Sequence, residues 1–168
     1  MDNSDFQKWM QWSDEFAETF HTSLLSISPD NLKSKFDHLK TSYSQEHKVR
    51  IPDPRNNVAA REFRDVLGIY KMVGHNPDNR KALYRGNLTL YWESPSIRAI
   101  WEIGPQQYQF GRGFFSNGFL YLAFYYTDDE KEFDGQIIYQ FTSDKRLVGF
   151  WVEEGSFVPG YEELLKIV

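Results

Sequence analysis

A set of aromatic side chains and one arginine are the residues of this chain best suited to hold a small molecule. They occur in short runs of the segment from Gly68 to Val168. Apolar walls exclude water and a single polar group orients a guest, so this set could bind an apolar or aromatic ligand, and the guanidinium could pair with an anionic one. The candidate ligand-binding residues are Tyr70, Trp101, Phe110, Arg112, Phe114, Tyr139 and Trp151.

The same side chains could instead form a solid core. The interior of a small barrel is narrow, and large side chains can fill it completely. Arg112 could then reach solvent at one end or pair with Glu102 or Glu153. The sequence leaves both arrangements open.

Metal binding has little support in the sequence. There is no cysteine, and the histidines lack the spacing of a zinc site. The acidic segment 128–135 has oxygen ligands at alternate positions, but an EF-hand alignment from Glu130 puts Phe141 where the bidentate glutamate belongs. We therefore expect an exposed acidic loop over 127–135, no metal site and no cofactor. The scattered histidines are His21, His38, His47 and His75.

Catalytic machinery is equally hard to find. The pairs Glu153-Glu154 and Glu162-Glu163 are adjacent in sequence, so the members of each pair point to opposite faces if they lie in strands. That is poor geometry for two-carboxylate catalysis. No phosphate-binding glycine loop or Gly-x-Ser-x-Gly motif is present. No catalytic residue is predicted, although acids and bases from distant strands could still meet at the mouth of a barrel.

The elements that must position these residues are short strands. Runs rich in aromatic and β-branched residues, separated by turn residues, predict a mainly β fold, an antiparallel up-and-down barrel of seven or eight strands. Asn117-Gly118 predicts a tight hairpin, and no gap after Gly68 is long enough for a crossover helix. We expect 161–168 to form the last strand and to pair with the first, because closure removes two edges.

Alternation along each strand predicts which side chains point inward. The strand 119–126 is apolar on both faces, so its outer face needs a cover. In 108–115 we expect the aromatic set with Arg112 to face the interior, opposite the set that contains Gly111 and Gly113. The other residues expected to face inward are Tyr70, Met72, Tyr84, Gly86, Leu88, Leu90 and Trp101.

The N-terminal third is predicted to be helical. Segment 5–27 has an amphipathic pattern and could cover the barrel. A second helix is predicted from Pro29 to about Ser42, and a short one over 58–67 with Asn57 as its cap. We therefore divide the chain into a helical arm and linker over 1–57 and a barrel over 58–168.

Charge and hydropathy limit the partners. The net charge is −5, and acidic and basic residues are spread along the chain, which argues against a nucleic-acid-binding surface. No apolar run approaches the roughly 20 residues of a membrane helix, and the acidic start of the chain does not indicate a signal peptide. We expect a cytoplasmic protein without membrane insertion.

Several short motifs carry a family resemblance. Gly68-Ile69-Tyr70 is similar to the Gly-x-aromatic start of lipocalin-like and avidin-like (calycin-like) barrels. The segments Trp101-Glu-Ile-Gly104, Gly111-x-Gly113, the strand of Tyr139 and Gly149-Phe-Trp151 resemble an uncharacterised bacterial group with that meander, over residues 68–168. The resemblance implies a small closed barrel, often with a ligand in its mouth.

Three functional hypotheses follow. The first is a module that binds a small apolar or aromatic ligand, including an anionic one, inside the barrel. The second is a protein interaction module with a solid barrel, whose exposed loops or helical arm contact another protein. The third is an enzyme with acid and base residues at the barrel mouth.

Overall fold

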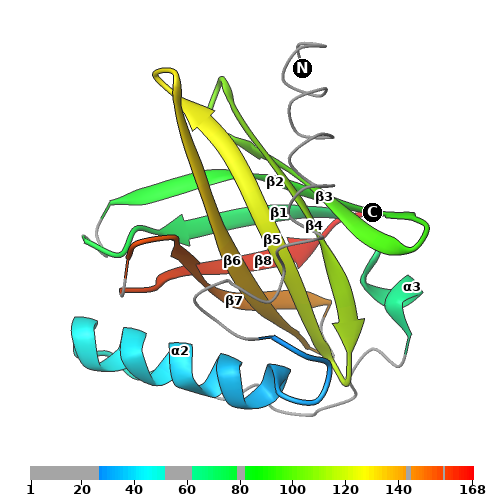
Figure 1. The fold of residues 1–168 in the computed structure, drawn as a ribbon, viewed down its shortest axis with the longest axis horizontal. Helices are drawn as coiled ribbons and strands as arrows, with labels where there is room; N and C mark the ends of the chain where they lie inside the picture. Colours follow the sequence, from blue (N-terminus) through cyan, green and yellow to red (C-terminus); the bar gives the residue numbers. More distant parts are fainter. Residues whose placement is uncertain (1–26, 52–61, 79–81, 143–144, 157) are drawn as a thin grey trace.

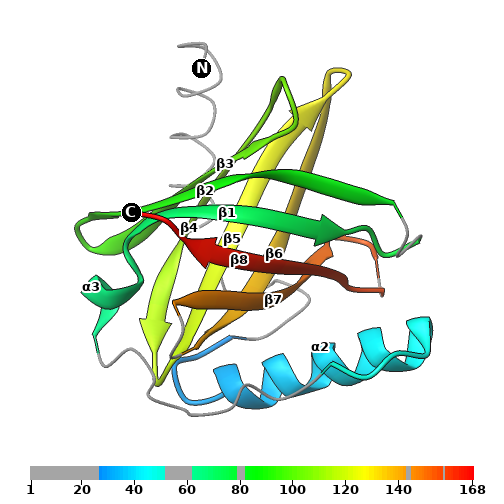
Figure 2. The same ribbon diagram turned by 180° about the vertical axis from the view of Figure 1, so that it is seen from behind.

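The computed structural model describes residues 27–51, 62–78, 82–142, 145–156 and 158–168. In this part of the chain, eight antiparallel strands form a closed barrel in sequence order, and the last strand pairs with the first (Figures 1 and 2). This confirms the predicted up-and-down barrel and sets the number of strands at eight. The strands are β1 (Gly68–His75), β2 (Leu83–Glu93), β3 (Ser96–Ile103), β4 (Gln107–Ser116), β5 (Phe119–Asp128), β6 (Lys131–Phe141), β7 (Arg146–Glu153) and β8 (Gly160–Lys166).

The hairpin turns are mostly tight. Asn117 and Gly118 both have positive φ, 51° and 86°, which confirms the turn predicted between β4 and β5. The expected long acidic loop at 127–135 is wrong. The ladder of β5 and β6 continues to the pair Asp128 and Lys131 and leaves a two-residue turn at 129–130, where both residues have positive φ, 49° and 63°, as a primed hairpin turn requires.

The interior follows the predicted alternation on most strands. Tyr70, Met72, Leu88, Leu90 and Trp101 are all buried in one apolar cluster inside the barrel. This confirms the inward faces expected for β1, β2 and β3.

Strand β4 has the opposite orientation from the one we expected. Gly111 faces inward, where an added Cβ would lie 2.6 Å from the Trp101 ring. Phe110, Arg112 and Phe114 point outward instead. Phe110 packs with Tyr125 in a separate outer cluster, Phe114 belongs to the cluster beneath the helix α2 described below, and the Arg112 Nε donates a 3.1 Å hydrogen bond to Ser96.

Helix α2 (Leu32–His47) lies on the outer surface of β5, β6 and β7 (Figure 1). Its Phe36 ring packs 5.3 Å from Phe119 and 5.4 Å from Phe150, between ring centroids. The predicted second helix is therefore present, with bounds shifted towards the C-terminus. It provides cover for the doubly apolar β5. The expected helix over 5–27 lies outside the described residues except for Ile27, which is buried in the same outer cluster.

Helix α3 (Phe63–Val66) closes the end of the barrel where β1 begins (Figure 2). Val66 is fully buried in the interior cluster and accepts a 2.7 Å hydrogen bond from the Tyr70 hydroxyl. Phe63 packs on Trp92, with ring centroids 4.4 Å apart. Of the helix expected over 58–67, residues 58–61 and the Asn57 cap lie outside the described residues, and Glu62 and Leu67 have extended backbone at the two ends of α3. No helix in the described part is long and apolar enough to cross a membrane.

Candidate functional site

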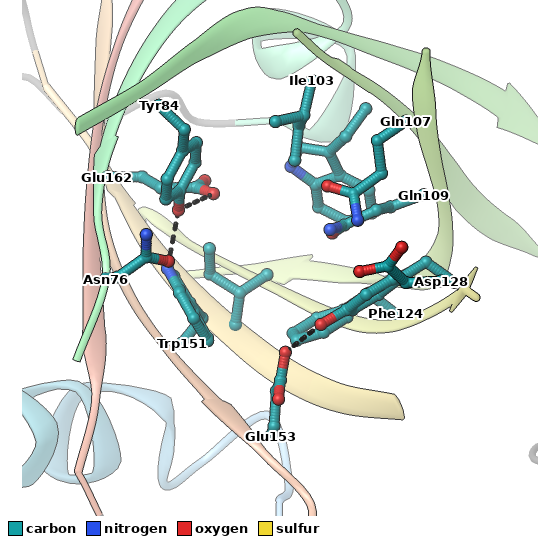
Figure 3. Close-up of a pocket in the computed structure, with 13 residues that line it drawn as sticks. Asn76, Tyr84, Ile103, Gln107, Gln109, Phe124, Asp128, Trp151, Glu153 and Glu162 are labelled. Atoms are coloured by element: carbon teal, nitrogen blue, oxygen red, sulfur yellow. Dashed lines mark hydrogen bonds between the residues drawn. The ribbon is translucent and has the colours of Figure 1, made fainter. Parts of the chain in front are cut away.

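A cavity of about 220 Å³ lies at the barrel end away from α3, where β1 finishes (Figure 3). The apolar cluster inside the barrel that contains Tyr70, Met72, Leu88 and Leu90 fills the end near α3, so the interior is packed at one end and hollow at the other. Hairpins and strand ends from around the barrel contribute to its wall. The lining residues are Asn76, Tyr84, Trp101, Ile103, Gln107, Gln109, Phe124, Tyr126, Asp128, Ile137, Trp151, Glu153 and Glu162.

Glu162 on β8 occupies the centre of a row that crosses several strands. It pairs in register with Gly74 on β1 and with Gly149 on β7. Those glycines pair in turn with Tyr84 on β2 and Tyr139 on β6. The row therefore has a carboxyl in the middle, a glycine on each side and a tyrosine at each end.

The two glycines let the tyrosines reach the carboxyl. An added Cβ at Gly74 would lie 1.9 Å from the Tyr84 ring, and one at Gly149 would lie 2.3 Å from the Tyr139 ring. Each ring thus lies across the glycine beside it. The Tyr84 hydroxyl donates a 2.8 Å hydrogen bond to Glu162 Oε1, and the Tyr139 hydroxyl donates to Oε2.

Two indoles complete this network. The Trp151 N–H donates to the Tyr84 hydroxyl at 2.8 Å, and the Trp101 N–H donates to the Tyr139 hydroxyl at 3.1 Å. Each tyrosine hydroxyl therefore accepts from an indole and donates to the carboxyl. The two hydrogen bonds from the tyrosines hold Glu162 in one orientation.

The burial of Glu162 changes its acidity. The residue is 4% exposed, and burial raises the pKa of its carboxyl to about 7, although the hydrogen bonds from Tyr139 and Tyr84 lower it. Burial and the neighbouring Glu162 charge raise the pKa of Tyr84 and of Tyr139 well above the usual value. The two phenols thus remain hydrogen-bond donors near neutral pH.

The opposite wall of the cavity is also polar and acidic (Figure 3). Glu153 accepts a hydrogen bond from the Tyr126 hydroxyl, and Asp128, Gln107 and Gln109 line the same space. The lining contributed by the described residues includes no lysine, arginine or histidine. The expected cationic interior is therefore wrong, since Arg112 lies on the outside and the ionisable groups inside are carboxyls and phenols.

The predicted site residues fall into three groups. Trp101 and Trp151 line the cavity, and Tyr139 lies inside the barrel and holds Glu162. Tyr70 lies at the closed end, bonded to Val66. The outward residues are Phe110, Arg112 and Phe114.

Sequence reasoning missed Glu162 as a site residue. The feature that could have identified it is its position in the predicted last strand, where Glu162 lies on the same face as Leu164, which points into the barrel. The signal was ambiguous because Glu163 and Leu165 form an equally mixed set on the other face. Adjacent Glu162 and Glu163 do point to opposite sides, one buried and one exposed.

The described residues contain no group of three or more histidine, cysteine, aspartate or glutamate side chains that could hold a metal ion. The acidic groups of the cavity therefore do not form a multidentate site of that kind.

Comparisons with known proteins bear on the fold alone. No protein-family model matches the chain, and no curated protein matches it. A solved structure of a redesigned β-barrel is similar, with a TM-score of 0.50 and 13% sequence identity over 67% of this chain and 100% of that one. This likeness agrees with the barrel architecture and leaves the lipocalin and avidin resemblance without family-level support.

Proposed function

We propose that the protein binds a small organic molecule in the hollow end of its barrel. The observation that carries this proposal is a cavity that combines aromatic walls with a buried, pre-oriented carboxyl, Glu162. Clefts that combine hydrophobic and aromatic side chains with a few placed polar groups are the usual form of ligand sites. A ligand at the mouth of a small barrel is also what the lipocalin-like and avidin-like resemblance implies.

The size of the cavity limits the ligand. Its volume of about 220 Å³ is below the roughly 300 Å³ at which sites for drug-sized molecules begin. The space suits a molecule of one aromatic ring with a short polar arm. Trp101 and Trp151 would contact such a ring from two sides of the barrel.

A fragment screen tests the proposal. Single-ring compounds are titrated against the protein, and binding is read by ligand-observed NMR and by tryptophan fluorescence. Ile103→Trp should block the cavity and abolish binding, because Ile103 lines it. Ile100→Trp is the matched control on the same strand, because Ile100 packs in the outer cluster. Failure of all fragments to bind, or equal binding by Ile103→Trp and the wild type, would contradict the proposal.

A second candidate is an enzyme that moves a proton. Its support is the carboxyl of Glu162, which has a pKa of about 7 and lines an accessible cavity. A buried acid that titrates near neutrality suits general acid–base catalysis. Fragments that bind are incubated in deuterated water and followed by NMR. Exchange at a carbon of the ligand that disappears in Glu162→Gln would support this candidate.

A further inference from the structure

The charge of the cavity wall defines the kind of ligand that it can hold. We infer that the proposed binding site takes a small aromatic amine in its protonated form, with the ammonium paired to Glu162 and the ring held among Trp101, Trp151 and Phe124. This inference rests on the proposed function and names the class of its ligand. It replaces the anionic ligand that the sequence alone suggested.

The first argument is charge. Glu162, Glu153 and Asp128 line the cavity, whereas the described lining has no basic side chain. Carboxylates in a partly enclosed, low-dielectric space repel an anion and attract a cation more strongly than they would in water. A ligand with one positive charge fits this field better than a neutral or an anionic ligand of the same shape.

The second argument is the free hydrogen-bonding capacity of Glu162. An ionised carboxylate has about four lone-pair positions, and Tyr84 and Tyr139 occupy one on each oxygen. The indole N–H groups bind the two tyrosine hydroxyls and not the carboxylate. Positions on Glu162 therefore remain for the N–H groups of an ammonium. Among the described residues, no basic side chain forms an ion pair with this buried carboxyl.

The third argument is the geometry of the rings. Phe124 meets Trp101 and Trp151 edge-on, with centroids 6.2 and 6.3 Å away, and stacks with Tyr126 at 6.3 Å. The rings thus meet at an angle, and all four line the cavity. Rings arranged in this way accept an aromatic ring by edge-to-face contact and stabilise a nearby cation through ring faces.

Three probes of nearly equal shape test the inference. Benzylamine, benzyl alcohol and benzoate are titrated against the wild type by calorimetry and NMR at about pH 8, where most of Glu162 is ionised. We expect benzylamine to bind about tenfold or more tightly than benzyl alcohol, and benzoate to bind most weakly. If none of the three binds, both the proposed function and this inference fail for single-ring ligands. If the alcohol or benzoate binds as tightly as the amine, the binding function stands and the cation preference is overturned.

Two variants test whether Glu162 is the source of the preference for benzylamine over benzyl alcohol. Glu162→Gln should weaken benzylamine about tenfold or more while leaving benzyl alcohol nearly unchanged. The control is Glu163→Gln, which removes the same charge from the exposed neighbour outside the barrel and should leave both affinities unchanged. Unaltered benzylamine binding by a folded Glu162→Gln variant would overturn the inference.

A pH series on the wild type covers the case in which Glu162→Gln does not fold. Between about pH 8 and about pH 5.5 benzylamine stays protonated, whereas Glu162 gains a proton, so we expect several-fold weaker binding at the lower pH. Among the described residues, the titratable groups that face Glu162 or share its cavity are Tyr84 on β2, Tyr139 on β6, Tyr126 and Asp128 on β5, and Glu153 on β7.

The same pH series on the variant Glu153→Gln shows whether Glu162 or Glu153 causes the pH dependence of benzylamine binding. A pH dependence that persists in this variant supports Glu162 as the partner of the amine. A dependence that disappears in Glu153→Gln, or equal wild-type affinity for benzylamine at both pH values, would overturn that pairing.

Discussion

At the scale of single residues, the ionisation of Glu162 controls how the stability of the barrel changes with pH. Folding raises the pKa of this carboxyl from 4.5 to about 7, so the folded protein binds the proton more tightly than the unfolded chain. The free energy of unfolding is then highest below about pH 4.5 as far as this group is concerned, and it falls as the pH rises to about 7. The total loss is on the order of 3 kcal/mol.

Glu162→Gln should remove most of this dependence. Its amide resembles the protonated carboxyl and does not ionise, so we expect the free energy of unfolding to change less between about pH 5 and about pH 7 than in the wild type. Denaturant unfolding at several pH values measures this. Glu163→Gln, on the exposed face, should keep the wild-type slope.

Asp134 gains a proton in an overlapping pH range, so its contribution to the pH dependence of stability must be measured separately from that of Glu162. Burial, together with the hydrogen bond that the protonated Asp134 donates to Glu154, raises the pKa of Asp134 to about 6, which contributes a slope of the same sign. The variant Asp134→Asn measures how much of the pH dependence of the free energy of unfolding comes from Asp134. If Glu162→Gln unfolds with the full wild-type slope, the assignment of the dependence to Glu162 is wrong.

Prediction from sequence succeeded for residues on strands with one clearly apolar face. Trp101 and Leu88 were predicted to be inside because polar residues alternate with their apolar neighbours. Glu162 could not be identified, because both faces of its strand mix glutamate with leucine. Phe110 and Phe114 were misplaced because aromatic size suggested the interior, whereas inward glycines on β4 make room for the Trp101 ring.

At the scale of elements, α2 stabilises the barrel from outside. Phe36 is 3% exposed and contacts rings of β5 and β7. Phe36→Ala should lower the free energy of unfolding by about 3–5 kcal/mol. The matched control is Asp37→Ala, an exposed position that pairs with Lys33, where a change within about 0.5 kcal/mol is expected. Similar losses in both variants, measured by denaturant unfolding, would mean that α2 does not support the barrel through this face.

The glycine positions on β7 and β1 decide whether the tyrosines can reach Glu162. In Gly149→Ala the new methyl group would collide with the Tyr139 ring at 2.3 Å, so we expect a loss of about 1–3 kcal/mol and a changed near-ultraviolet circular dichroism of the buried aromatic rings.

Gly104→Ala is the control for backbone strain alone. No atom lies within 4 Å of its added Cβ, although φ is +58°, so we expect about 1–2 kcal/mol of strain and an unchanged aromatic spectrum. An unchanged spectrum in Gly149→Ala would contradict the role of that glycine.

At the scale of the whole molecule, the closure of the barrel can be predicted from the sequence, whereas the cavity inside it cannot. The turn residues and the short apolar runs indicated a meander, and an eighth strand follows from the need to pair two open edges, as β8 does with β1 and β7. Whether a barrel is solid or hollow depends on a few interior positions. Here the rings of Tyr84, Trp101, Tyr139 and Trp151 lie against glycines at positions 74, 111, 149 and 160, and a cavity remains beside Tyr84, Trp101 and Trp151.

The indole N–H signals provide the most direct test of the account. Trp101 and Trp151 line the cavity, whereas Trp92 packs on Phe63 at the closed end. Nitrogen-15 correlation spectra are recorded during a benzylamine titration, and the signals are assigned with single Trp→Phe variants. We predict that the Trp101 and Trp151 signals shift along one saturation curve while the Trp92 signal stays in place. Unchanged signals of Trp101 and Trp151 at saturating benzylamine, or a shift confined to Trp92, would contradict a ligand site in the hollow end of the barrel.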